Sequence, residues 1–126
     1  MSPLIRSLLV VAPLCLAAAV THAEVVSWTG SAYSNSHTVK PKKVLEVCAD
    51  VAAKQSVAWK FTADSDVDFN VHRHAGAGGK QVIYDVEATR VRERSGTLAH
   101  AAAHEWCWMW TNVSATDVTV RVELKR

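Results

Sequence analysis

A strict alternation of apolar and polar residues limits what this chain can fold into. Between residues 117 and 124, valine or leucine occupies every second position, while Thr119, Arg121 and Glu123 lie between them. A period of two places all the apolar side chains on one face of a β-strand. The stretch therefore predicts a strand with one buried face and one face toward solvent.

The same alternation recurs along the chain. In residues 66–74, Val67, Phe69 and Val71 alternate with polar residues. Further strands are expected at 25–29, 44–47, 55–62, 81–86, 89–94 and 105–110, of which 81–86 and 89–94 are either separate or continuous. Turn-forming residues separate these stretches at 64–66, 76–79, 95–96 and 112–117. An alanine-rich segment at 98–105 is the one helical candidate, but it is too short to be stable unless packed. The pattern predicts an all-β fold, an antiparallel β-sandwich of about seven or eight short strands.

Residues 1–23 have the three parts of a secretory signal peptide. Arg6 precedes an apolar run at 8–20, and Thr21-His22-Ala23 offers a small residue for cleavage. The apolar run is shorter than the roughly 20 residues needed to span a bilayer. We therefore expect a protein that is periplasmic or secreted, with a single domain at 24–126 and no membrane span in the mature chain.

Charge and motifs exclude several classes of function. The formal net charge of the 126 residues is only +2, whereas nucleic-acid binding needs a concentrated basic field. The carboxylates are dispersed, and neither a nucleophile elbow nor a phosphate-binding loop is present. The leading hypothesis is therefore a non-enzymatic module that binds an unidentified protein or small ligand.

Two cysteines, Cys48 and Cys107, remain after signal-peptide removal. In an oxidising compartment a single pair is most simply one disulfide. A metal-bound thiolate or a redox role is the alternative, which the absence of a Cys-x-x-Cys spacing supports poorly.

Four histidines form two closely spaced pairs. On a strand, His72 and His74 share one face, which points outward because the apolar residues take the other. His100 and His104 suit one face of a helical turn or the two ends of a tight hairpin. Imidazole binds Cu(II) and Zn(II), and the thioether of Met109 suits Cu(I). The alternative hypothesis is thus a periplasmic copper- or zinc-binding protein, although all four histidines could also be ordinary surface residues.

Three tryptophans and three arginines can each be interpreted either as structural residues or as ligand-binding residues. Trp106, Trp108 and Trp110 share one strand face, which is typical of core residues but also fits a ligand platform beside Met109. Arginines at 90, 92 and 94 form either a patch for an anionic ligand or a solvated outer face.

The order of motifs from Val44 onward resembles the GOLD (Golgi dynamics) domain, the lumenal β-sandwich of Golgi-to-ER cargo receptors. The residues that carry the resemblance are Val47-Cys48, 57–61, 66–71, 76–79, 82–84, Ser95-Gly96, Trp106-Cys107-Trp108 and Asn112. The resemblance implies a GOLD-like or jelly-roll-like sandwich in which Cys48 and Cys107 lie on neighbouring strands and are joined.

The same resemblance has limits. It implies that the strand with His72 and His74 could lie beside the hairpin with His100 and His104, which would bring the two pairs together. The chain ends at Arg126 without the coiled coil, membrane helix and tail of the receptors, and His104-Glu105 replaces an expected glycine. The receptor function is therefore not implied.

Overall fold

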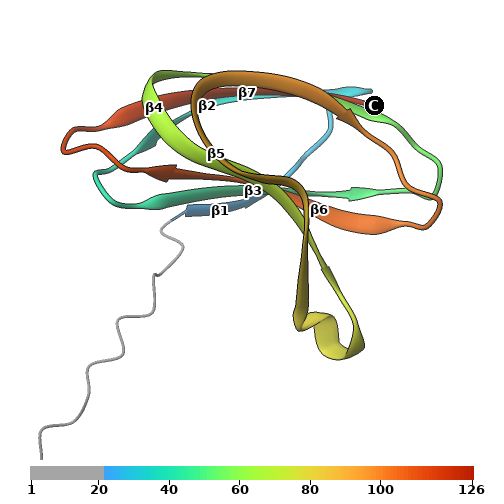
Figure 1. The fold of residues 1–126 in the computed structure, drawn as a ribbon. Coiled ribbons are helices and arrows are strands. Elements are labelled where there is room, and N and C mark those ends of the chain that lie inside the picture. The colour runs from blue at the N-terminus through green and yellow to red at the C-terminus, as the bar shows by residue number, and fades with distance from the viewer. Residues whose placement is uncertain (1–21) are drawn as a thin grey trace, which may run out of the picture.

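The computed structural model describes residues 22–126 (Figure 1). The predicted signal peptide lies outside this range except for His22 and Ala23, which belong to the first strand. The strands are β1 (His22–Val25), β2 (Ala32–Val39), β3 (Val44–Val51), β4 (Val57–Ala75), β5 (Gln81–Leu98), β6 (His104–Asn112) and β7 (Val118–Lys125). A 3₁₀ turn, η1 (Ala77–Gly79), connects β4 to β5. In this part of the chain, none of the elements is a helix of the length and apolarity that crossing a bilayer requires.

The strands form one sheet that curls over itself into two layers. Its order is β1-β3-β6-β4-β7-β2, with β5 also paired to β4. β4 belongs to both layers, because its residues 58–63 pair with β7 and its residues 67–73 pair with β6. The all-β, sandwich-like fold is confirmed. The expected purely antiparallel sheet is corrected at one point, since β1 runs parallel to β3.

Alternating side chains from both layers make the core. The rings of Phe61 and Phe69 lie 4.5 Å apart, and each ring centroid is 5.5 Å from that of Trp110. The β7 residues alternate in burial as the sequence predicts. All three tryptophans of β6 are at most 1% exposed, so they are core residues and form no accessible platform.

Two predicted turns lie inside long strands. At 64–66 the chain continues as β4, because Asp64 accepts a hydrogen bond from the Thr119 backbone and Asp66 forms an ion pair with Arg92. Gly96 lies within β5 opposite Trp59, and a Cβ there would come 2.6 Å from the indole carbon Cζ2. The glycine allows the indole to approach the backbone instead of making a turn.

The expected strands at 81–86 and 89–94 are one continuous strand, β5. β4 and β5 therefore extend beyond the two layers as a hairpin that ends at η1 (Figure 1). The strands are longer than the short ones predicted. The alanine-rich segment at 98–105 forms no helix, because its exposed alanines have nothing to pack against.

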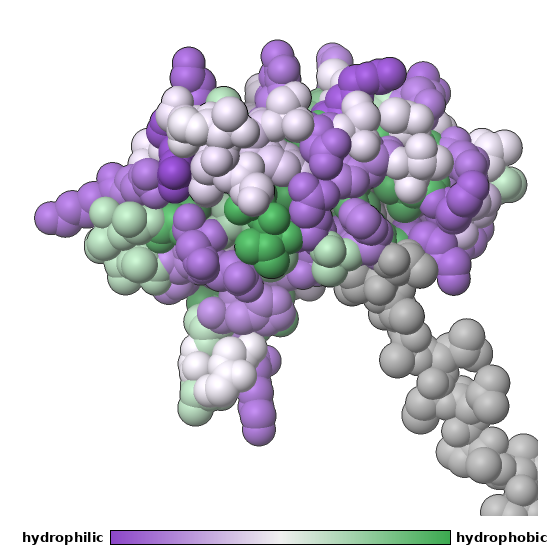
Figure 2. All heavy atoms as spheres, turned by 180° about the vertical axis from the view of Figure 1, so that it is seen from behind, coloured by the Kyte–Doolittle hydropathy of each residue, from purple (hydrophilic) through white to green (hydrophobic). Residues whose placement is uncertain are grey.

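Polar side chains cover most of the surface seen from behind, with hydrophobic residues in small areas between them (Figure 2). In the described residues, the exposed large apolar side chains are Val25, Val82 and Tyr84.

Candidate functional site

One row of side chains crosses five strands of the same layer. The pairing register places Val25 beside Cys48, Cys48 beside Cys107, Cys107 beside His72 and His72 beside Tyr84. Directly paired residues point to the same side of a sheet. Because Trp106 and Trp108 on either side of Cys107 enter the core, the row lies on the opposite side, which we call the outer face.

The predicted disulfide between Cys48 and Cys107 is confirmed. It joins β3 to β6, because the two cysteines are directly paired residues of these neighbouring strands in one layer. Cys48 is 8% exposed and Cys107 is 1% exposed, so the bond is nearly covered although it lies on the outer face.

His72 is on the predicted face, but the expectation that it is exposed is wrong. Only 5% of the residue is accessible, because the rings of His74 and Tyr84 lie 5.2 and 6.0 Å from its ring. Its Nδ1 donates a 2.8 Å hydrogen bond to Oδ1 of Asn70. In the neutral ring this leaves Nε2 with a free lone pair. Burial lowers the pKa of His72 and its neighbour His74 lowers it further, although Glu46 acts in the opposite direction, so the ring is neutral at pH 7.

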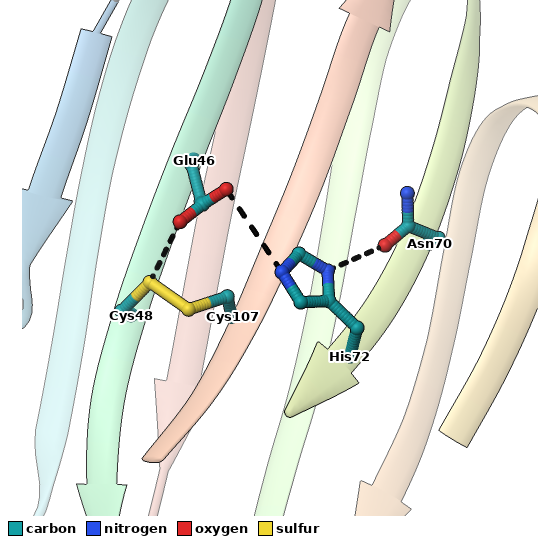
Figure 3. Close-up of a disulfide and its surroundings, with 5 residues drawn as sticks. All are labelled: Glu46, Cys48, Asn70, His72 and Cys107. Carbon is teal, nitrogen blue, oxygen red and sulfur yellow. Dashed lines mark hydrogen bonds and ion pairs between the residues drawn. A yellow bond between two sulfur atoms is a disulfide. The ribbon is translucent and has the colours of Figure 1, made fainter. Parts of the chain in front are cut away.

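Glu46 brings a carboxylate to this imidazole from β3. Its Oε2 lies 4.0 Å from Nε2 of His72, and its Oε1 lies 3.3 Å from Sγ of Cys48 (Figure 3). Four ångströms is too long for a hydrogen bond, and a disulfide sulfur carries no proton to donate. The arrangement therefore presents two electron-pair donors, Nε2 and Oε2, to the same small space.

A metal ion would fit these donors. Zinc lies about 2.0–2.2 Å from imidazole nitrogen and carboxylate oxygen, so two such donors of a tetrahedral ion are about 3.4 Å apart. The two atoms here are 4.0 Å apart, and a shift of about 0.6 Å brings them to that spacing. One ligating atom from each of His72, His74 and Cys107 also lies within 4.8 Å of the other two. The bond of Asn70 to Nδ1 is the kind of outer contact that orients metal-binding histidines.

Met109 occupies the next row of the outer face. It is directly paired with Glu46 on one side and with Asn70 on the other. Its half-buried thioether is therefore a soft donor at the margin of the site.

The second histidine pair forms, but not at this site. The rings of His100 and His104 are 4.5 Å apart, and that of His104 is 5.9 Å from Trp106. Trp106 is paired with Arg73, one residue from His72, and therefore lies on the other face of the layer. The expectation that the two pairs converge is thus wrong, because strand register separates them.

Arg73 also makes the surroundings of the second pair unfavourable for a cation. Its guanidinium lies 3.5 Å from Nε2 of His104, and its Nε forms a 3.1 Å ion pair with Asp85. Burial, followed by the charge of Arg73, lowers the pKa of His104. A metal ion there would lie beside a guanidinium, although the ion pair with Asp85 offsets part of its charge.

Two of the three arginines of β5 are paired with carboxylates. Arg90 lies 2.9 Å from Asp68, and Arg92 lies 3.1 Å from Asp66. Arg94 instead donates a 3.5 Å hydrogen bond to the hydroxyl of Thr89, so the possible anion patch is neutralised at two of its three arginines.

Another group of ligating atoms within 4.8 Å consists of His22, Glu24 and His37. The predicted cleavage after Ala23 would remove His22, so this group depends on one residue that the mature chain is expected to lose.

Sequence reasoning missed Glu46 and Asn70. The available signal was the Glu46-x-Cys48 spacing, which puts the carboxylate on the strand face of the cysteine. Asn70 has the corresponding spacing to His72, but neither spacing shows which strands lie next to each other.

No protein-family model and no curated protein sequence matches the chain. Its fold is similar to that of PliG of Aeromonas hydrophila, a periplasmic inhibitor of g-type lysozyme, with a TM-score of 0.59, 15% identity, and coverage of 82% of this chain and 94% of that one. CorA of Methylomicrobium album BG8, a surface-associated copper-binding protein, gives a TM-score of 0.55 at 9% identity, covering 82% and 96%. The pre-peptidase C-terminal domain of Bacillus anthracis collagenase gives 0.54 at 10% identity, covering 82% and 94%. These likenesses establish the fold, and none of the three proteins is a GOLD domain.

Proposed function

We propose that this protein is an exported, non-enzymatic binding module whose ligand is a copper or zinc ion. Its proposed ligands are His72, which lies 4.0 Å from Glu46, together with Glu46 and His74. A ligating nitrogen of His74 lies within 4.8 Å of one of His72, and the exposed side chain of His74 turns toward Glu46 when all three bind one ion. The observation that carries the proposal is the buried, neutral imidazole of His72, whose Nδ1–H is fixed by Asn70 while Nε2 faces Glu46 at 4.0 Å.

The donor set decides which ions suit the site. Two imidazoles and a carboxylate favour Zn(II) or Cu(II) over the harder Mg²⁺ and Ca²⁺, which prefer oxygen ligands. Three protein donors leave a fourth position for water or for a group from a partner molecule. Met109 beside Glu46 adds a soft donor that favours copper.

Export is supported by the signal-peptide pattern and by the disulfide, since disulfides persist in oxidising compartments. The likeness to the copper-binding CorA agrees with a metal ligand, although what is shared at 9% identity is the fold.

A protein ligand is the second candidate. Val25 and Tyr84 are 72% and 47% exposed at the two ends of the row that contains the disulfide. PliG, which has a similar fold, is an inhibitor of another protein.

The test is a titration of the oxidised, metal-free protein with Cu(II) and Zn(II) at about pH 7, followed by calorimetry. His72→Ala/His74→Ala removes two donors, and His100→Ala/His104→Ala is the matched control on the other face. We expect the wild type and the control to bind one ion with a Kd of about 1 µM or less, and the first variant to bind at least about tenfold more weakly. Equal binding by both variants, or none by the wild type, would eliminate the metal function and leave the protein ligand.

A further inference from the structure

The disulfide lies inside two overlapping groups of metal-ligating atoms. Sγ of Cys107 is within 4.8 Å of ligating nitrogens of His72 and His74, and the Glu46 carboxylate is as close to both cysteine sulfurs. While the sulfurs are bonded to each other they are uncharged and donate weakly. As thiolates, they would be the strongest zinc ligands in the cluster.

We propose that the Cys48–Cys107 disulfide is the redox control of the metal site. Its reduction turns a site with two imidazoles and a carboxylate into one with two imidazoles and two thiolates, which binds a thiophilic ion such as Zn(II) more tightly. The inference rests on the metal site proposed above and adds its regulation.

The chemistry balances with a dithiol as the reductant. The dithiol gives two electrons and two protons to the sulfur–sulfur bond and closes into its own disulfide, leaving thiols at Cys48 and Cys107. Zn(II) then binds the two sulfurs and displaces their two protons to solvent. Attack of the dithiol is expected at Cys48, because this residue is 8% exposed and Cys107 only 1%.

The fold keeps the sulfurs together after the bond is broken. β3 and β6 are paired along all eight residues of β3, from Val44 opposite Thr111 to Val51 opposite His104. Zn–S bonds of about 2.3 Å at a tetrahedral centre place two sulfurs about 3.8 Å apart, which directly paired residues can reach.

Charge favours a cation in the reduced state. Oε1 of Glu46 is 3.3 Å from Sγ of Cys48, so a thiolate there would lie against a carboxylate. Two adjacent negative charges in a largely covered place repel each other, and a bound divalent ion removes the repulsion. A bound divalent ion is therefore expected to stabilise the reduced site more than the oxidised site.

The two cysteines are not equivalent, which provides a matched test. Cys107 is grouped with both histidines, whereas Cys48 is grouped with Glu46. Cys48→Ala and Cys107→Ala each remove the disulfide and each leave one thiol, so they differ only in where that thiol lies.

We would measure Zn(II) affinity by competition with a chelator and use Co(II) as a spectroscopic substitute. Cys48→Ala is expected to bind Zn(II) at least about tenfold more tightly than Cys107→Ala, and to show thiolate-to-cobalt charge transfer that disappears with His72→Ala/His74→Ala. Equal affinities, or no charge transfer in Cys48→Ala, would overturn the proposal.

A second measurement uses the wild type, in case either variant does not fold. The protein is reduced with a dithiol, desalted without oxygen and titrated with Zn(II), beside the oxidised protein. Circular dichroism monitors the sheet, and alkylation of the thiols monitors their protection by zinc. We expect tighter binding and slower alkylation in the reduced protein.

Unchanged affinity, or a reduced chain that stays unfolded with Zn(II) present, would contradict the redox control. Failure of the oxidised protein alone to bind metal would instead overturn the proposed function, so the two failures are distinguishable.

Discussion

Tyr33 on β2 donates a 2.7 Å hydrogen bond to the carboxylate of Glu24 on β1, and this contact joins the strands at opposite ends of the sheet order. Nε2 of His37, also on β2, lies 3.4 Å from the same carboxylate. Burial, reinforced by Glu24, raises the pKa of Tyr33, so its hydroxyl keeps its proton and stays a donor. The edges of the curled sheet are thus held together by a polar contact.

Replacing Tyr33 by phenylalanine should weaken the fold by about 1–2 kcal/mol, because it removes a hydrogen bond to a charged acceptor and leaves the ring in place. Urea denaturation measures the free energy of unfolding. Tyr84→Phe is the control, since its half-exposed ring should tolerate the change within about 0.5 kcal/mol. Equal stabilities of the two variants would show that the contact does not hold the edges.

Stability should fall as the pH drops below about 6.5. Burial lowers the pKa of His37, while Glu24 opposes the shift. His22 adds to it only in the uncleaved chain, and the hydroxyl of Tyr33 also faces the ring, at 3.3 Å. The pKa of His37 is lower in the folded protein than in the unfolded chain, which has the ordinary value. At a pH between these two values, the unfolded chain therefore binds more protons than the folded one. The contribution of His37 is therefore fully present above the ordinary pKa and declines until the pH passes the folded value.

Denaturant unfolding at about pH 7.5 and about pH 5.5 checks this dependence in the wild type and in His37→Gln. The variant should lose less stability between the two conditions. His72 and His104 have pKa values shifted in the same direction, so part of the decline should remain. A wild-type stability that is unchanged or higher at the lower pH would refute the expectation.

Gly96→Ala should destabilise the protein by about 1–3 kcal/mol, because the added methyl group meets the ring of Trp59. The nearest ring carbon would lie 2.6 Å away, so the indole must move. Thermal unfolding and tryptophan fluorescence report both effects. Ser95→Ala, at an exposed neighbouring position of β5, is the control. A native fluorescence spectrum with full stability would mean that Trp59 does not depend on the glycine.

Asn70→Ala should weaken metal binding by about tenfold or more, although Asn70 is not itself a proposed ligand. Without its oxygen, the proton of His72 is free to move to Nε2, the nitrogen proposed to bind metal. Nitrogen NMR of the imidazole distinguishes the two tautomers in metal-free protein. Asn70→Asp retains an oxygen acceptor and should keep the proton on Nδ1. If Asn70→Ala leaves the tautomer and the affinity unchanged, Asn70 does not position His72.

Local pattern was enough to predict much of the fold. Alternation identified β6 and β7 and the two halves of β4, which it predicted as separate strands. It also assigned the tryptophans of β6 a core face as one of two alternatives. These features depend on a period of two, which each short segment carries by itself. The pairing of Cys48 with Cys107 followed because the mature chain is expected to contain just these two cysteines.

Other features could not be seen locally. β2 was missed because its sequence, AYSNSHTV, is mostly polar, and it forms a strand because β7 offers a ladder of backbone partners. Pairing with neighbouring strands also explains why β4 and β5 continue through segments that contain turn-forming residues. The paired strands satisfy the backbone hydrogen bonds of these segments, and ion pairs such as Asp66–Arg92 satisfy their polar side chains.

The sequence by itself determined which residues alternate, that two cysteines are available to pair, and that His72 and His74 share a strand face. Only the tertiary structure decided that Glu46 faces His72 and that the disulfide lies beside these two residues. It also placed His100 and His104 on the other face of the layer, next to Arg73 and away from that site. The physical reason is strand register. A shift of one residue exchanges the two faces of a strand, and the register is fixed by burial over the whole sheet, which no single segment encodes.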